Sequence, residues 1–219
     1  FDATCPLVTK VHMEVRKHAK ASKDIILVGH EGHPEVEGTM GRHINSDNSS
    51  IYLVQNELDA KNIKINNPTK LALVTQTTLS VDETKSIIDI LKYRFPDIDI
   101  PKKDDICYAT QNRQDAVKQL ALESDFMIVV GSKNSSNSNR LSELAEKCGC
   151  RSILIDEFTD IDLDDLNKYS KISITAGASA PESKVMEIAK SLELHTDAEI
   201  IEHGEDNEDI YFKLPPGLR

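Results

Sequence analysis

The chain of 219 residues is long enough for one large domain or for two domains of about 100 residues each. Charged residues make up 29% of it and its formal net charge is −11. This excess of acid argues against a protein of nucleic acids or membrane surfaces, because both need clustered Lys and Arg. Four cysteines in such a chain are too few for a disulfide scaffold and fit a reducing compartment.

Apolar runs alternate with helical patterns along the chain, which is typical of an α/β fold with parallel strands. The predicted strands are 25–28, 51–54, 71–74, 126–130, 152–155 and 172–174. The predicted helices are 8–19, 81–95, 113–123, 141–147 and 181–192. His12 and His18 fall on a Lys/Arg-rich helical stretch, so we expect both at the surface.

The two halves of the chain repeat one pattern. Cys5 precedes Gly29 by 24 positions, and Cys107 precedes Gly131 by 24 positions. In both halves the order is Cys, helix, strand, polar Gly-containing turn, two further strands and a Thr-containing turn before a helix. An internal repeat of this kind indicates a duplicated structural unit.

The duplication predicts a first α/β domain over 1–103, a second over 104–192 and a tail over 193–219. Pseudo-symmetric packing would bring the thiolates of Cys5 and Cys107 toward one axis, as in a metal site. The alternative is that both are buried structural cysteines, a common fate of free Cys. The periodicity also suggests an earlier repeat with another Cys that this sequence lacks.

Polar residues are dense directly after the first predicted strand, at 29–38. A neutral His and a nearby Glu in this turn would suit a proton relay, and His33 would also suit a hydrogen bond to phosphate. The spacing of His30 and His33 equally resembles zinc ligation. A solvated turn with capping acids is the third interpretation.

The equivalent turn of the second half, 131–140, contains mainly Ser and Asn and precedes a helix. Small hydroxyl and amide groups at a helix start suit an anion, although the same residues also fill ordinary flexible turns. Two shorter turns, 75–80 and 175–181, match each other. Their hydroxyls would either cap the following helices or hold a phosphate or an alcohol.

Six segments in order, including FDATCP at 1–6 and KKDDICYAT at 102–110, together resemble the motifs of LytB-type 4-hydroxy-3-methylbut-2-enyl diphosphate reductases. The other four are the turns at 29–38, 75–80, 131–140 and 175–181. The resemblance implies an α/β fold of three pseudo-threefold-related domains with small, mostly parallel sheets around a central cavity. This chain would hold two of them and would lack the N-terminal domain.

The resemblance also implies a 4Fe-4S iron–sulfur cluster held by three Cys, one from each domain, with the fourth iron open to substrate. Cys5 and Cys107 match two of these ligands. Glu35 matches the residue that delivers protons, and Thr77 matches the hydroxyl near the substrate alcohol. The residues that match diphosphate-binding positions are His33, Ser135, Ser136, Asn137 and Ser179.

The implied reaction is the last step of the non-mevalonate isoprenoid pathway, in which two electrons and two protons convert the substrate into isopentenyl or dimethylallyl diphosphate and water. A ferredoxin- or flavodoxin-type electron donor is the expected partner, and neither nucleic acid nor membrane is expected. The expected location is a plastid-type organelle (apicoplast) or a bacterial-type cytoplasm. Because the third Cys would be missing, the 219 residues alone should bind a cluster poorly and be inactive.

Two rival functions follow from the same residues. The first is a zinc-dependent hydrolase that uses His30, His33 and Cys5. The second is a non-enzymatic phosphosugar-binding domain that uses the Ser/Asn turn.

Overall fold

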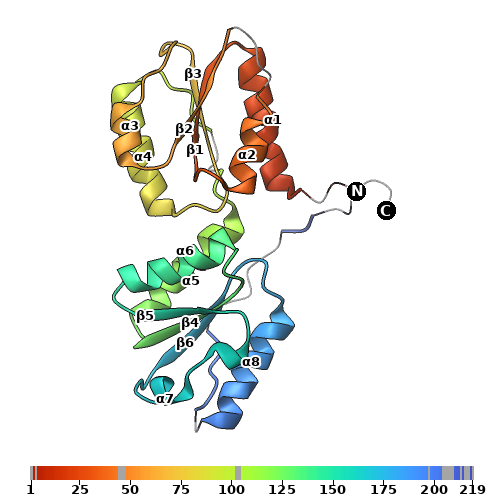
Figure 1. Ribbon diagram of the computed structural model, residues 1–219, viewed down its shortest axis with the longest axis vertical. Coiled ribbons are helices and arrows are strands. Elements are labelled where there is room, and N and C mark those ends of the chain that lie inside the picture. Colours follow the sequence, from red (N-terminus) through yellow and green to blue (C-terminus); the bar gives the residue numbers. More distant parts are fainter. Residues whose placement is uncertain are drawn as a thin grey trace. The chain divides into compact units, whose positions relative to one another are not determined.

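The computed structural model describes residues 2, 4–43, 48–101, 105–196, 198–203, 210–212, 214 and 218. The chain divides into two compact units, unit 1 with Phe1–Cys107 and Glu208–Arg219, and unit 2 with Tyr108–Asn207. Within each unit a three-stranded parallel sheet is covered by helices on both faces (Figure 1). In the part of the chain that is described, no helix is long and apolar enough to cross a membrane.

Unit 1 is built around the central strand β1. Its elements are α1 (Pro6–Lys20), β1 (Asp24–Val28), α2 (Pro34–Met40), β2 (Ile51–Val54), α3 (Glu57–Asn62), β3 (Leu71–Thr75) and α4 (Val81–Arg94). The strand order is β2-β1-β3, and both neighbours pair with β1 in parallel. Val28 pairs with Val54 and with Thr75, so the three strands end at the same edge of the sheet.

Unit 2 repeats this arrangement around β4. Its elements are α5 (Tyr108–Ala121), β4 (Phe126–Val130), α6 (Ser136–Lys147), β5 (Arg151–Ile155), the 3-10 helix η1 (Phe158–Asp160), α7 (Leu163–Leu166), β6 (Ile172–Ala176) and α8 (Glu182–His195). The strand order β5-β4-β6 is the same order as in unit 1. The predicted duplication and the α/β class are therefore confirmed.

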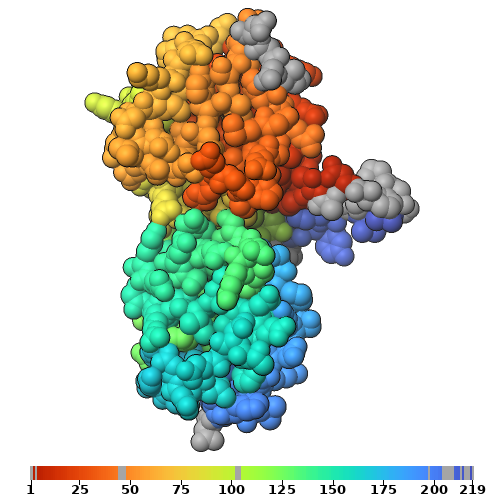
Figure 2. All heavy atoms as spheres, viewed as in Figure 1, coloured from red at the N-terminus to blue at the C-terminus, as the bar shows by residue number. Residues whose placement is uncertain are grey.

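Both central strands are buried along their whole length. In β1, Ile25 and Leu27 pack with α1 and α2, whereas Ile26 and Val28 pack on the opposite face, where α3 and α4 lie. A strand with helices on both sides is mainly apolar, and β1 accordingly is a continuous apolar run from Ile25 to Val28. Figure 2 shows the outer face of each unit with all heavy atoms drawn, in the same view and colours as Figure 1.

Helices α2 and α3 were not among the predicted elements. They have only 7 and 6 residues, too short for a clear helical period, and α2 contains Gly38. The expectation for His12 and His18 was wrong, since only 8% and 9% of these residues is exposed. Both lie among the buried residues of α1, where the ring carbons add to the apolar face.

A buried carboxylate holds the start of β1 in place. Asp24 accepts hydrogen bonds from the backbone N–H groups of Ser50 and Asn67, both at 2.9 Å, and from the Tyr52 hydroxyl at 3.3 Å. In unit 2, Asp125 accepts in the same way from the N–H groups of Ser170 and Lys171. An acid at the start of β1 (Asp24) and one directly before β4 (Asp125) thus tie later loops to the central strand.

We expect Asp24→Ala to lower the free energy of unfolding by about 1–3 kcal/mol, because two backbone donors lose their acceptor in a buried place. Asp97→Ala removes an exposed carboxylate from the same unit and should change stability by less than about 0.5 kcal/mol. Urea unfolding of both variants measures the difference. Equal stabilities of the two variants would contradict this role of Asp24.

Candidate functional site

In unit 1 the polar residues gather at the edge where the three strands end. Because α1 precedes β1 and runs back along the sheet, its first turn lies at this same edge, a common place for ligand sites in parallel sheets. Cys5 is the N-cap of α1 and is exposed. Cys107 is partly exposed and directly precedes α5, and its N–H donates to the Thr77 carbonyl oxygen at 3.0 Å.

The turn after β1 needs a glycine at its first position. A Cβ built on Gly29 would lie 2.6 Å from Cγ2 of Val36, which is too close for any side chain. The chain then turns into α2, with His33 as the N-cap and Pro34 as the first helical residue. Proline suits this position because its fixed φ is helical and its missing N–H is not needed there.

His33 is held as a neutral ring with a defined tautomer. Its Nδ1 accepts a hydrogen bond from the backbone N–H of Glu35 at 3.2 Å, and burial lowers the pKa of His33. A neutral ring whose Nδ1 accepts must carry its proton on Nε2. His33 can therefore offer Nε2–H as a donor to an anion.

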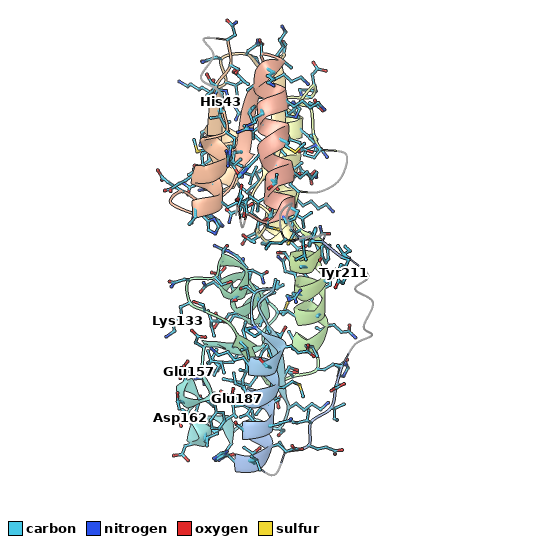
Figure 3. The ribbon with its side chains drawn as sticks, turned by 90° about the vertical axis from the view of Figure 1, so that its right-hand side faces the viewer. His43, Lys133, Glu157, Asp162, Glu187 and Tyr211 are labelled. Carbon is cyan, nitrogen blue, oxygen red and sulfur yellow. The ribbon has the colours of Figure 1, made fainter. Side chains whose placement is uncertain are left out.

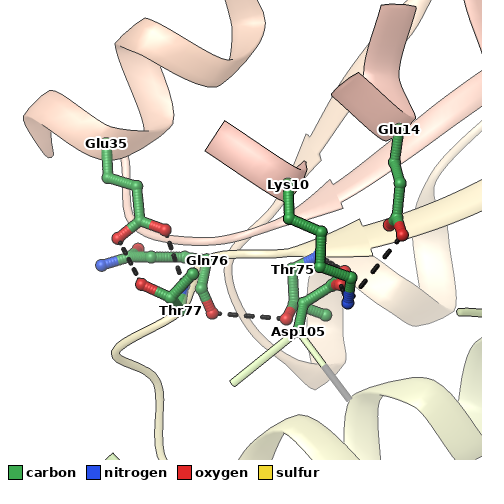
Figure 4. A network of polar contacts seen from close by, with 7 residues as sticks. All are labelled: Lys10, Glu14, Glu35, Thr75, Gln76, Thr77 and Asp105. Atoms are coloured by element: carbon green, nitrogen blue, oxygen red, sulfur yellow. Dashed lines mark hydrogen bonds and ion pairs between the residues drawn. The ribbon is translucent and has the colours of Figure 1, made fainter. Parts of the chain in front are cut away.

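Glu35 is a partly buried carboxyl group at the start of α2, and it is bound to Thr77 through both of its oxygens (Figure 4). Oε1 accepts from the Thr77 N–H at 2.7 Å, and Oε2 lies 3.1 Å from the Thr77 hydroxyl, which donates to it. Burial raises the pKa of Glu35, the two bonds from Thr77 oppose this rise, and the charge of Asp105 adds to it. The site therefore favours a carboxyl group that holds its proton to higher pH than an exposed glutamate does.

Two buried residues near this edge were not singled out from the sequence. The Gln76 side chain accepts from the His30 N–H at 3.1 Å and donates to the Thr78 hydroxyl at 3.0 Å. These two bonds join the turn after β1 to the turn after β3. Asp105 accepts from the Thr75 N–H at 3.1 Å. Both belong to motifs on which the family resemblance rests, but only the folded chain shows what they contact.

In unit 2 the turn after β4 becomes more buried toward α6. Lys133 is exposed and its side chain points away from the ribbon (Figure 3). Ser135 is the N-cap of α6 and accepts from the Ser138 N–H at 3.3 Å, and Ser136 is the first helical residue. Ser135 and Ser136 are partly buried, whereas Asn137 is only 5% exposed.

Asn137 carries a buried amide with no partner. Neither its Nδ2 nor its Oδ1 makes a hydrogen bond in the structure. Buried polar side chains almost always have partners, so an unpaired amide at a helix start points to a ligand that supplies them. Ser179, in the exposed turn between β6 and α8, is the remaining predicted residue of this unit.

Ser138 wedges the start of α6 against two glycines. Its hydroxyl would collide with a Cβ placed on either Gly131 or Gly177, the residues that follow β4 and β6. The Ser138 Cβ would lie 2.8 Å from a Cβ on Gly131 but 3.3 Å from one on Gly177. The two glycines therefore let α6 approach both strand ends.

We expect Gly131→Ala to cost about 1–3 kcal/mol of stability through overpacking, and Gly177→Ala to cost less. Adding Ser138→Ala should restore the stability of Gly177→Ala, because the remaining 3.3 Å contact is tolerable. It should restore that of Gly131→Ala only in part, because the 2.8 Å contact remains. Thermal unfolding of the four variants checks this, and an equal rescue of both would contradict it.

The residues predicted from the sequence thus fall into one group per unit. Unit 1 brings His33, Glu35 and Thr77 to its strand ends, with Cys107 joined to Thr77. Unit 2 has Ser135, Ser136, Asn137 and Ser179 in the turns that follow β4 and β6.

The zinc interpretation is not supported by the placement of its residues. Nδ1 of His33 is taken by a backbone N–H, and no group of three or more His, Cys, Asp and Glu side chains that could hold a metal ion occurs among the residues described. In the described part of the chain, His30, His33 and Cys5 thus do not form a metal-binding group of three side chains. A cluster that takes only two ligands from this chain is compatible with the same finding.

Comparison with known proteins gives one consistent family. The family model of LytB protein matches residues 1–193. A 4-hydroxy-3-methylbut-2-enyl diphosphate reductase from Saccharophagus degradans is 55% identical over 219 residues, which cover all of this chain and 70% of that protein. The protein of the same name from Pseudomonas putida is 56% identical over 221 residues, again with 100% and 70% covered.

Solved structures agree. The E-1-hydroxy-2-methyl-but-2-enyl-4-diphosphate reductase from Plasmodium falciparum superposes with a TM-score of 0.81 and 38% identity, over 87% of this chain and 59% of that one. The chain therefore spans about 70% of the length of the two bacterial relatives and 59% of the Plasmodium chain. It belongs to the LytB family of 4-hydroxy-3-methylbut-2-enyl diphosphate reductases, a family of oxidoreductases.

Proposed function

We propose that the chain contributes to the two-electron reductive dehydroxylation of 4-hydroxy-3-methylbut-2-enyl diphosphate. The C–O bond of the allylic alcohol breaks, two electrons and two protons enter, and isopentenyl or dimethylallyl diphosphate leaves together with water. The family supports the substrate and the reaction class. The observation that carries the proposal is the arrangement at the end of β3, where Thr77 is bonded to Glu35 through its N–H and hydroxyl and to Cys107 through its carbonyl.

We propose Cys5 and Cys107 as two of three ligands of a 4Fe-4S cluster. All four cysteines are free of disulfides, and these two alone immediately precede a helix. When bound, the cluster would supply the electrons and a Lewis-acidic iron to the reaction.

Glu35 would deliver the proton to the departing hydroxyl. A raised pKa lets the carboxyl group keep its proton to higher pH than an exposed glutamate does, and its bonds to Thr77 fix the direction in which it can give that proton. The hydroxyl of Thr77, a residue that is 4% exposed, would orient the substrate alcohol.

Neutral donors would hold the diphosphate. In unit 1, His33 offers Nε2–H to an anion. In unit 2, the start of α6 offers the Ser135 and Ser136 hydroxyls and the unpaired amide of Asn137. Ser179 would add a hydroxyl from the turn after β6. A helix start with several small donors binds a diphosphate by many hydrogen bonds rather than by cationic side chains.

We propose a ferredoxin- or flavodoxin-type protein as the electron donor, because the reaction needs electrons at low potential. We also propose a reducing compartment, since the four cysteines are free.

The test uses the full-length gene product that contains these residues, purified without oxygen and assayed with dithionite-reduced viologen. The expected result is a brown protein that consumes the alcohol and releases both isoprenoid diphosphates. A colourless protein that binds the substrate diphosphate equally well when Cys5 and Cys107 are replaced by Ala would instead show a non-enzymatic phosphate-binding protein.

A further inference from the structure

Asp105 is a buried carboxylate for which the reaction described above has no use. Its side chain has no exposed surface, and it lies two residues before Cys107. Removing a charged group from water is costly, so a buried carboxylate needs both hydrogen bonds and a counter-charge. The contacts of Asp105 show what that charge is used for.

One oxygen of Asp105 completes the edge of the sheet. β3 lies at the edge of the sheet, so every second backbone N–H of this strand points away from β1 and needs another acceptor. The N–H of Leu73 is one of these, and it donates to the Asp99 carbonyl at 2.9 Å. The next outward donor, the Thr75 N–H, is taken by Oδ2 of Asp105 at 3.1 Å. A neutral amide would satisfy Thr75 equally well, so this bond does not explain a charged side chain.

The other oxygen binds helix α1. Lys10 Nζ lies 3.1 Å from Oδ1 of Asp105 and 3.8 Å from Oε1 of Glu14 (Figure 4). Lys10 stands in the second turn of α1, which begins after Cys5 with the bond from the Thr9 N–H to the Cys5 carbonyl. The ion pair therefore joins the helix that begins at Cys5 to the segment that leads into Cys107.

The same segment is fixed at a second point. The N–H of Cys107 donates to the Thr77 carbonyl at 3.0 Å, two residues beyond Thr75. Asp105 and Cys107 thus bind β3 and the residues after it at two positions, and Lys10 adds α1 as a third support.

We propose that Asp105 is a positioning residue, and that its ion pair with Lys10 holds the Cys5 and Cys107 thiolates in fixed relation to one another for binding a single iron–sulfur cluster. The inference rests on the proposed function, because it needs a cluster held by both thiolates. It adds a residue pair that touches neither the substrate nor the iron.

The following variants remove the charge of Asp105 or of Lys10 but keep a side chain of similar size. Asp105→Asn keeps an acceptor for the Thr75 N–H and removes the ion pair, and Lys10→Met removes it from the other side. Lys10→Arg retains the cation. Lys61→Met is the matched control, because Lys61 pairs with Glu57 on a helix of the same unit at 3.2 Å, but both side chains are more than half exposed.

Each full-length variant is purified without oxygen. Its iron content after a chelator challenge, the EPR spectrum of its reduced cluster and the urea midpoint of its apo form are then measured. In Asp105→Asn and Lys10→Met, the chelator concentration that removes half of the iron should be about 10- to 100-fold lower than in the parent. The EPR spectrum of the reduced cluster should also be altered. Lys10→Arg and Lys61→Met should match the parent. The apo forms of Asp105→Asn, Lys10→Arg and Lys61→Met should unfold near the parent midpoint, whereas Lys10→Met leaves the buried Asp105 carboxylate unpaired and should unfold at lower urea.

The inference is overturned if Lys10→Met binds its cluster with the parent's chelator resistance and spectrum. It is also overturned if the apo form of Asp105→Asn, which leaves no unpaired buried charge, is unfolded or strongly destabilised, since Asp105 would then serve stability and not the thiolates. A parent protein that holds no cluster would refute the proposed function itself, and this result is read from the parent alone.

Discussion

Replacing Glu35 by Gln is expected to lower kcat by about 10²- to 10⁴-fold, the usual contribution of a positioned acid or base, with little loss of stability. The Gln oxygen can still accept from the Thr77 N–H, and its amide can donate to the Thr77 hydroxyl, so both contacts of the carboxylate have a substitute. What Gln lacks is a proton to give. Steady-state assays with reduced viologen, paired with urea unfolding, measure the two effects separately.

Glu37→Gln is the matched control, because Glu37 lies in the same helix turn but is exposed. It should leave kcat within about twofold, as expected of an exposed surface substitution. Equal loss of activity in both variants, or an active Glu35→Gln, would remove Glu35 from the reaction.

The raised pKa of Glu35 sets the direction of the pH dependence. A carboxyl group that must donate a proton is competent only below its pKa, so kcat should fall as pH rises through the raised value. The native state also holds this proton more tightly than the unfolded state does, so the free energy of unfolding should decrease over the same rise in pH. Glu35→Gln should remove that slope, and a rate that increases with pH would contradict the assignment.

Replacing either Cys5 or Cys107 by Ala in the full-length gene product should reduce activity and visible iron–sulfur absorption to background. A cluster held by three thiolates loses an iron ligand with each substitution. Both residues lie at helix starts on the surface of unit 1, so neither substitution leaves a cavity in the core. Iron analysis and visible spectra of protein prepared without oxygen give the result directly.

Cys148 provides the control for these two variants. It is partly exposed like Cys107, but it follows the end of α6 instead of preceding a helix. Cys148→Ala should keep the colour and the activity of the parent. If Cys148→Ala lost its colour as fully as the Cys5 and Cys107 variants, the loss would come from general damage to the protein and not from a missing iron ligand.

Much of the fold follows from local patterns in the sequence. The strands were predictable because a parallel strand with helices on both faces is apolar throughout and ends at a turn, as β1 does at Gly29 and β4 at Gly131. α5 begins five residues before its predicted start at Arg113, because its first turn, YATQN, has no apolar period. α2 was hidden inside a polar turn, although Pro34 and the acids after it are typical of a helix start.

The candidate site was predictable only to the level of its motifs. The family resemblance supplied Glu35 and Thr77, but the bond between them joins residues 42 positions apart and needs the folded sheet. The contacts of Asp105 and Gln76 are hidden in the sequence for the same reason, since no local pattern shows which buried N–H an acid or amide will reach. The empty hydrogen-bonding positions of Asn137 likewise appear only once α6 is packed.

The most direct test is a crystal structure of the full-length gene product, grown without oxygen from brown protein. The Sγ atoms of Cys5 and Cys107 should both bind iron of one cluster, and the Glu35 carboxyl group should lie on the side of that cluster where the substrate alcohol binds. A structure in which these two sulfur atoms have no iron cluster in common would contradict the account.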